Sequence, residues 1–80
     1  MRNVVYCAPF PGIPATHRFG GALRSLSGVR LLGVFQEPPS REVAQTYDDV
    51  AVVRDALDPR QLLAGVESLR KKHGPPHQIV

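Results

Sequence analysis

The segment from Pro9 to Arg18 holds the residues best suited to chemistry. It reads PFPGIPATHR and follows an apolar run. Thr16 predicts the N-cap of a helix from about residue 17 to about residue 27, because threonine oxygens accept hydrogen bonds from exposed N–H groups. His17 and Arg18 then lie in the first turn, where the helix dipole is already positive. Cations are unfavourable there unless an anion faces them, which predicts a phosphate or carboxylate ligand.

The same loop limits what kind of ligand is expected. Its candidate anion-binding residues are Pro11, Gly12, Thr16, His17 and Arg18. Gly12 is its only glycine before the expected helix, and neither a G-x-G-x-x-G fingerprint nor a Walker A sequence is present. A dinucleotide site of the usual kind is therefore not expected. The alternative interpretation is structural: the prolines shape a tight turn, Thr16 caps the helix and Arg18 points to solvent.

A second candidate follows the apolar run 49–53, which predicts a strand. Acidic residues at the carboxyl end of a parallel strand lie on the ligand-binding edge of the sheet. Asp58 is better explained as a helix cap, since it precedes Pro59 and lies three residues before Gln61. Asp55 is therefore the candidate substrate-binding residue of this segment, and a purely structural turn is the alternative.

The remaining reactive side chains predict no catalytic or metal site. His17, His73 and His77 do not form a zinc-binding spacing. No serine lies in a nucleophile-elbow context. The single cysteine, Cys7, lies in the most apolar run, which indicates a buried structural thiol in a reducing compartment. We therefore assign no catalytic residue and no metal ligand.

Composition and charge limit the classes of protein to which this chain can belong. Eighty residues with 42% apolar content make at most one small folded domain. The net charge is +3, and the only basic run, 70–72, falls at the end of an expected helix rather than in a dense stripe, so no nucleic-acid partner is expected. No apolar segment is long enough for a membrane span, and no signal peptide is recognisable. We expect a cytoplasmic protein without a membrane partner.

Apolar runs and turn residues predict the order of secondary structure. Strands are expected over 3–8, 29–35, 49–53 and from 77 onward, with helices over 17–27 and 58–73 and a short helical segment over 41–45. Gly20 and Gly21 weaken the first of these helices, which indicates that it approaches the sheet closely. Ser40 and Asp58 are the expected caps of the other two.

This order, β-α-β-(α)-β-α-β, predicts an α/β fold. Alternating strands and helices form parallel sheets with right-handed crossovers, and continuously apolar strands suit a sheet covered on both faces. We expect a three-layer, Rossmann-like parallel sheet of about four strands in the order 3-2-1-4. The first strand is then central, and the loop PFPGIPAT lies at the topological switch point.

The chain is expected to be one domain, 1–80, of a longer polypeptide. It stops soon after a strand begins at residue 77, before that strand fills its place in the sheet. An uncovered sheet edge at this strand would favour dimerisation or strand exchange, so a homodimer is an expected assembly if the chain exists alone.

The segment TYDDVAVVRDALDPRQLLAGVESLRKKHGPPHQIV resembles the small domain that precedes the ATP-grasp domain in ATP-grasp ligases, such as biotin carboxylase and carbamoyl phosphate synthetase. The similar features are Asp48-Asp49, the strand 50–53, Asp55, Asp58-Pro59, Leu62-Leu63 and Ile79-Val80. The earlier segment GVRLLGVFQEPPS is also similar. The family often has a glycine-rich first loop, whereas this loop is rich in proline.

The resemblance implies an ATP-dependent ligase in which this domain is inactive alone. ATP and magnesium would bind to the remaining domains of the same chain, and no cofactor is expected in residues 1–80. The first loop would frame the pocket for a small anionic acceptor substrate, through Pro11, Gly12, Thr16, His17 and Arg18. The alternative is a free-standing Rossmann-like binding or regulatory module. A response-regulator-like or NAD-binding domain is less well supported, because the required acidic cluster and glycine fingerprint are missing.

Overall fold

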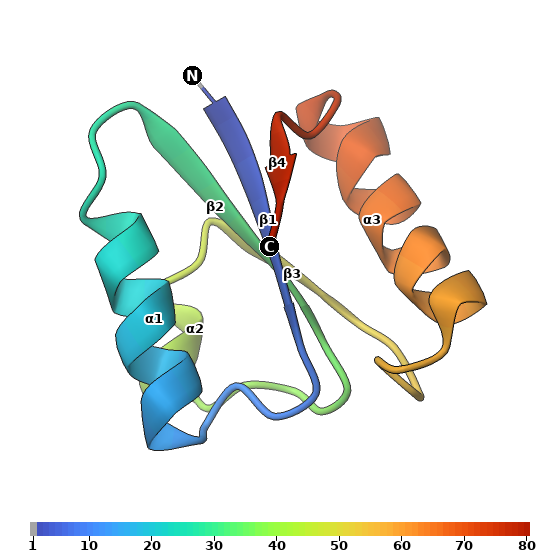
Figure 1. The fold of residues 1–80 in the computed structure, drawn as a ribbon, viewed down its shortest axis with the longest axis horizontal. Helices are drawn as coiled ribbons and strands as arrows, with labels where there is room; N and C mark the ends of the chain where they lie inside the picture. Colours follow the sequence, from blue (N-terminus) through green and yellow to red (C-terminus); the bar gives the residue numbers. More distant parts are fainter. Residues whose placement is uncertain (1) are drawn as a thin grey trace.

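A four-stranded parallel sheet forms the centre of the protein (Figure 1). The computed structural model describes residues 2–80. Its elements are β1 (Arg2–Ala8), α1 (Pro14–Arg24), β2 (Val29–Phe35), α2 (Arg41–Ala44), β3 (Asp49–Val52), α3 (Pro59–His73) and β4 (Gln78–Ile79). The strand order is β3-β2-β1-β4, and every neighbouring pair is parallel. The predicted fold class and strand order are confirmed.

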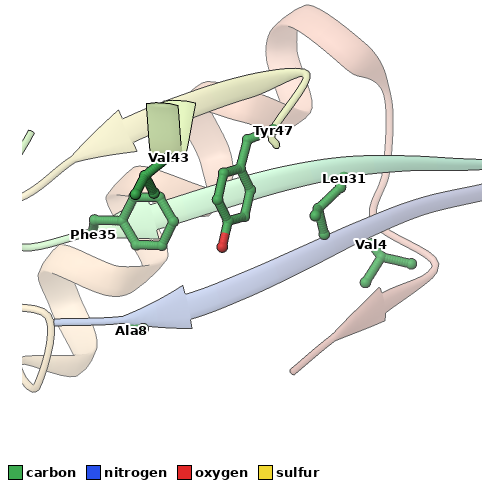
Figure 2. Packing of buried hydrophobic residues seen from close by; sticks show 6 residues of the cluster. All are labelled: Val4, Ala8, Leu31, Phe35, Val43 and Tyr47. Atoms are coloured by element: carbon green, nitrogen blue, oxygen red, sulfur yellow. The ribbon is translucent and has the colours of Figure 1, made fainter. Parts of the chain in front are cut away.

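Helices cover both faces of this sheet, with α1 and α2 on one face and α3 on the other (Figure 1). Successive side chains of a strand point to opposite faces, so each strand contributes to both sides of the core. The α1/α2 face buries Val4, Ala8, Leu31, Phe35, Val43 and Tyr47, which Figure 2 shows together. The α3 face buries Val5, Leu32, Val34 and Leu69. The continuous apolar runs of β1 and β2 are explained by this burial on two faces.

The start of α1 differs from the prediction. The helix begins at Pro14, its N-cap is Ile13, and no side chain caps it. Proline is well suited to the first helical position because its φ angle is already helical and its missing N–H would have no partner there. Thr16 is therefore inside the first turn rather than at the cap. The helix also ends earlier than expected, at Arg24.

The other helix boundaries agree with the caps predicted from the sequence. The Ser40 hydroxyl accepts a hydrogen bond from the Val43 N–H, and Asp58 accepts one from the Arg60 N–H. Helix α3 begins at Pro59 as expected, and Gly74 with φ of 90° follows its last residue. No helix in residues 2–80 is long and apolar enough to cross a membrane.

Gly20 allows α1 to contact Tyr47, which lies in the loop between α2 and β3. A Cβ atom at Gly20 would collide with the hydroxyl of Tyr47, whereas one at Gly21 would meet nothing within 4 Å. The close contact thus involves Gly20 and not Gly21, and its partner belongs to the loop between α2 and β3 rather than to a strand of the sheet. The Tyr47 ring packs edge-on against Phe35, with ring centroids 5.0 Å apart. Burial of the hydroxyl raises the pKa of Tyr47 to about 12, with a further contribution from Tyr6.

Candidate functional site

The loop between β1 and α1 leaves the sheet at its carboxyl edge, next to the reversal of strand order between β1 and β4. Pro11 is fully buried within it. The loop is joined to the end of β2, because the Gln36 N–H donates to the Pro9 carbonyl at 2.9 Å. Gly12 is exposed, has no positive φ and would accept a Cβ without contact. Neither backbone strain nor crowding therefore requires a glycine there.

The cationic residues lie deeper in α1 than the sequence predicted. Because the helix starts at Pro14, His17 is its fourth residue, and the His17 N–H already donates to the Ile13 carbonyl at 2.9 Å. The prediction that His17 and Arg18 occupy the first turn after a Thr16 cap is therefore wrong. Proline has no N–H, so the donors without intrahelical partners are reduced to those of Ala15 and Thr16 beside the N-cap.

The side chains of this segment differ in their surroundings. Thr16 and His17 are half-buried, and Arg18 is exposed. The Nδ1 atom of His17 is buried and has no hydrogen-bond partner within residues 2–80. The first turn of α1 contains no acidic residue. Arg18 is thus the cation of this loop that can reach a solvent-borne anion.

Asp55 lies at the same edge, in the turn after β3, but its carboxylate already has a local role. Its Oδ1 accepts a hydrogen bond from the Leu57 N–H at 2.9 Å, and its own N–H donates to the Gln61 side chain at 2.7 Å. Asp58 closes the same turn by accepting from the side chain of Gln61 at 3.2 Å. Asp55 is exposed, so its second oxygen remains accessible. The geometry agrees with the structural alternative for this segment.

Gln36 connects the two loops, a role that sequence reasoning missed. Its N–H holds the first loop through Pro9, and its side-chain Oε1 accepts from the Ala56 N–H in the third-strand loop at 3.1 Å. This bridge arises because β2 lies between β1 and β3 in the sheet. The only signal in the sequence was a glutamine directly after an apolar strand.

Apolar side chains are exposed at this carboxyl edge. Phe10 and Ile13 in the first loop are 42% and 48% exposed, and Leu57 in the third-strand loop is 78% exposed. The edge is therefore a mixture of exposed apolar side chains and the exposed guanidinium of Arg18. Within residues 2–80 it has no pocket.

The opposite edge carries a polar network that the sequence did not predict. We call it the amino-edge cluster; its members are Asn3, Arg30, Asp49, His73 and His77. The buried amide of Asn3 donates to the carbonyls of His73 and Pro75 at 2.9 and 3.2 Å, which satisfies the end of α3. Arg30 also donates to the His73 carbonyl, at 3.3 Å.

Two histidines of this cluster have different partners. His73 Nε2 lies 2.9 Å from Asp49 Oδ2, whereas His77 Nδ1 accepts a hydrogen bond from the Asn3 N–H at 3.0 Å. The hydrogen bond from His73 lowers the pKa of Asp49 below its ordinary value, with further lowering by the Val50 N–H and Lys72. Within residues 2–80, no three histidine, cysteine or acidic side chains are grouped to hold a metal ion.

Cys7 is half-buried on the α3 face of the sheet and packs at the rim of its core, so it is less buried than the sequence predicted. Burial raises the pKa of its thiol, which favours the neutral form.

Comparisons with known proteins were made at three levels, and no family model, curated protein or solved structure matches this chain. The geometry itself defines the protein as a small α/β domain with a four-stranded parallel sheet in the order 3-2-1-4.

Proposed function

We propose that the chain is the N-terminal, pre-ATP-grasp-type domain of an ATP-dependent ligase, where it frames the acceptor-substrate pocket and is inactive alone. The observation that supports this proposal is the parallel order β3-β2-β1-β4. This order puts the loop between β1 and α1 at the reversal point, where open α/β sheets bind their ligands. The resemblance to ATP-grasp ligases supplies the type of reaction.

In such a ligase a substrate carboxylate attacks the γ-phosphorus of ATP, which releases ADP and forms an acyl phosphate. An amine or another nucleophile then attacks the acyl carbon and releases phosphate. ATP and magnesium would be bound by the remaining domains. The contribution of this domain would be to orient the anionic acceptor, with Arg18 as the exposed cation of the first loop and Asp55 at the same edge of the sheet.

The test uses the full-length protein that contains residues 1–80. We expect ATP binding, and ATP-dependent phosphate release when carboxylate and amine substrates are supplied, and neither from the 80 residues alone. Replacing Arg18→Gln should raise the KM for the acceptor and leave ATP binding unchanged. Lys71→Gln is the matched control, because it removes one exposed positive charge at the opposite edge. A full-length protein that binds no ATP would overturn the proposal.

The alternative is a free-standing binding or regulatory module. It is favoured by Phe10, Ile13 and Leu57, whose exposed apolar side chains at one edge of the sheet suit a binding partner. Titration of the ¹⁵N-labelled chain with inorganic phosphate or acetate, followed by NMR, tests the module, because a free-standing module must bind its ligand without further domains. Saturable shifts confined to residues 12–19 of the isolated chain support the module. If no such shifts occur, this loop does not bind anions in the isolated chain.

A further inference from the structure

The attachment of β4 is the feature of the amino edge that carries an inference. Within residues 2–80 this strand has two residues, and its one neighbour in the sheet is β1. Ile79 and Val80 are 56% and 39% exposed, so their burial contributes little to its attachment. Within residues 2–80, this segment is joined to β1 by a short series of hydrogen bonds. Backbone bonds join His77 to Asn3, Val80 to Val5 and Cys7 to Val80.

The side chain of His77 adds one bond to this series. Its Nδ1 accepts from the Asn3 N–H at 3.0 Å, while its own N–H donates to the Asn3 carbonyl at 2.8 Å. An imidazole nitrogen accepts a hydrogen bond only when it carries no proton. The ring must therefore be neutral, with its proton on Nε2. A second proton, on Nδ1, would make the ring N–H and the Asn3 N–H point at each other, and no hydrogen bond could form between them.

We propose that His77 is a pH-sensitive latch, whose protonation breaks the bond to Asn3 and releases β4 from the outer edge of β1. Histidine is the side chain whose charge changes between about pH 5 and about pH 8. Release would leave the backbone groups of Asn3, Val5 and Cys7 on that side of β1 without partners. An edge of this kind can accept a strand from another chain.

The other charged groups at this edge determine whether the response is specific to β4. On the elements that meet there, these groups are Arg2, Arg24, Arg30, Asp48, Asp49, Lys71, Lys72 and His73. His73 faces a carboxylate instead: its Nε2 lies 2.9 Å from Asp49 Oδ2, so a positive charge on this ring would be attracted to Asp49. Acidification should therefore keep the end of α3 on β3 while it loosens β4.

The test is NMR on the ¹⁵N-labelled chain. Imidazole nitrogen shifts should show His77 as the Nε2–H tautomer at neutral pH. Between about pH 7.5 and about pH 5.5, protection factors corrected for intrinsic exchange should fall about five-fold at the Cys7 and Val80 amides, since one neutral hydrogen bond is lost. The Val53 amide, which donates to Phe35 across β2 and β3, is the internal reference and should not change.

Two substitutions separate the latch from general acid sensitivity. His77→Asn puts an amide oxygen near the position of Nδ1, so it keeps an acceptor at every pH and should abolish the response. His77→Ala should lower protection at both pH values. The proposal is overturned if His77→Asn retains the response, if Cys7 and Val80 change only in parallel with Val53, or if the response disappears in His73→Asn instead. The wild-type and His77→Asn data decide the question if the alanine variant does not fold.

Discussion

The two edges of the sheet are built in opposite ways. At the carboxyl edge, Phe10 is exposed in the proline-rich first loop and Leu57 in the loop after β3, and one side chain, Gln36, joins these two loops. At the amino edge, the side chains of the amino-edge cluster tie β1, β2, β3 and β4 to the end of α3. The edge expected to bind ligands is thus the less cross-linked one. The opposite edge carries the polar contacts that hold the layers together.

A second polar contact of the amino edge supports this distinction. Asp48 lies just before β3, and its Oδ2 accepts from the Leu31 N–H at 2.8 Å and from the Arg24 guanidinium at 2.5 Å. One carboxylate therefore connects α1, β2 and β3. No side chain at the carboxyl edge, within residues 2–80, has an ion pair. If this comparison is correct, polar substitutions at the amino edge should cost more stability than those at the carboxyl edge.

The largest effect is expected for Asn3→Ala. Asn3 is 4% exposed, and its amide donates to the carbonyl of His73, the last residue of α3, and to that of Pro75 just beyond the helix. Its loss should lower the free energy of unfolding by about 2 to 3 kcal/mol, measured by urea denaturation. Asn3→Leu should cost a similar amount, because it also removes the donor to the Pro75 carbonyl and leaves Arg30 as the remaining side-chain donor to the His73 carbonyl. If Asn3→Leu restores wild-type stability, packing rather than hydrogen bonding explains the residue.

A smaller effect is expected for Gln36→Ala at the carboxyl edge. The variant removes the acceptor for the N–H of the buried Ala56, and about 1 kcal/mol of stability should be lost. Amide exchange at Ala56 should become faster. Gln36→Glu keeps an oxygen in that position and should behave nearly as the wild type. A loss as large as that of Asn3→Ala would contradict the difference between the edges.

The smallest effect is the pH dependence that Asp49 contributes. Its folded-state pKa is lowered from the ordinary value of 3.8, first by the hydrogen bond from His73. A lowered carboxyl pKa gives a stabilisation that is fully present above the unfolded-state pKa and is lost as pH falls through the folded-state pKa. The difference in Tm between wild type and Asp49→Asn should therefore shrink between about pH 5 and about pH 2.5. A constant difference over that range would show that the His73 contact does not stabilise the folded state.

Elements with strong local signals were predictable, and contacts between distant segments were not. Asp58-Pro59 marks the start of α3, and Ser40 marks the start of α2, because each cap acts within three residues of its own position. The first helix was placed too late because Thr16 and Pro14 are both plausible N-terminal residues. Proline at the first position prevailed over a threonine cap, and this moved His17 and Arg18 out of the first turn.

The sequence by itself determined the element order and the parallel sheet, since apolar runs and turn residues are local and crossovers have one hand. The strand order 3-2-1-4 that was predicted with them is the observed one. Only the tertiary structure decided which polar groups meet. Asn3 is 74 positions from His77, and Gln36 is 20 from Ala56, yet each pair is within hydrogen-bond distance. The reason is that β1 and β4 begin side by side at the amino edge, and β2 and β3 end side by side at the carboxyl edge. Such pairs leave no periodic pattern in the chain, so the contact between His77 and Asn3, on which the proposed latch rests, became visible only when the sheet was assembled.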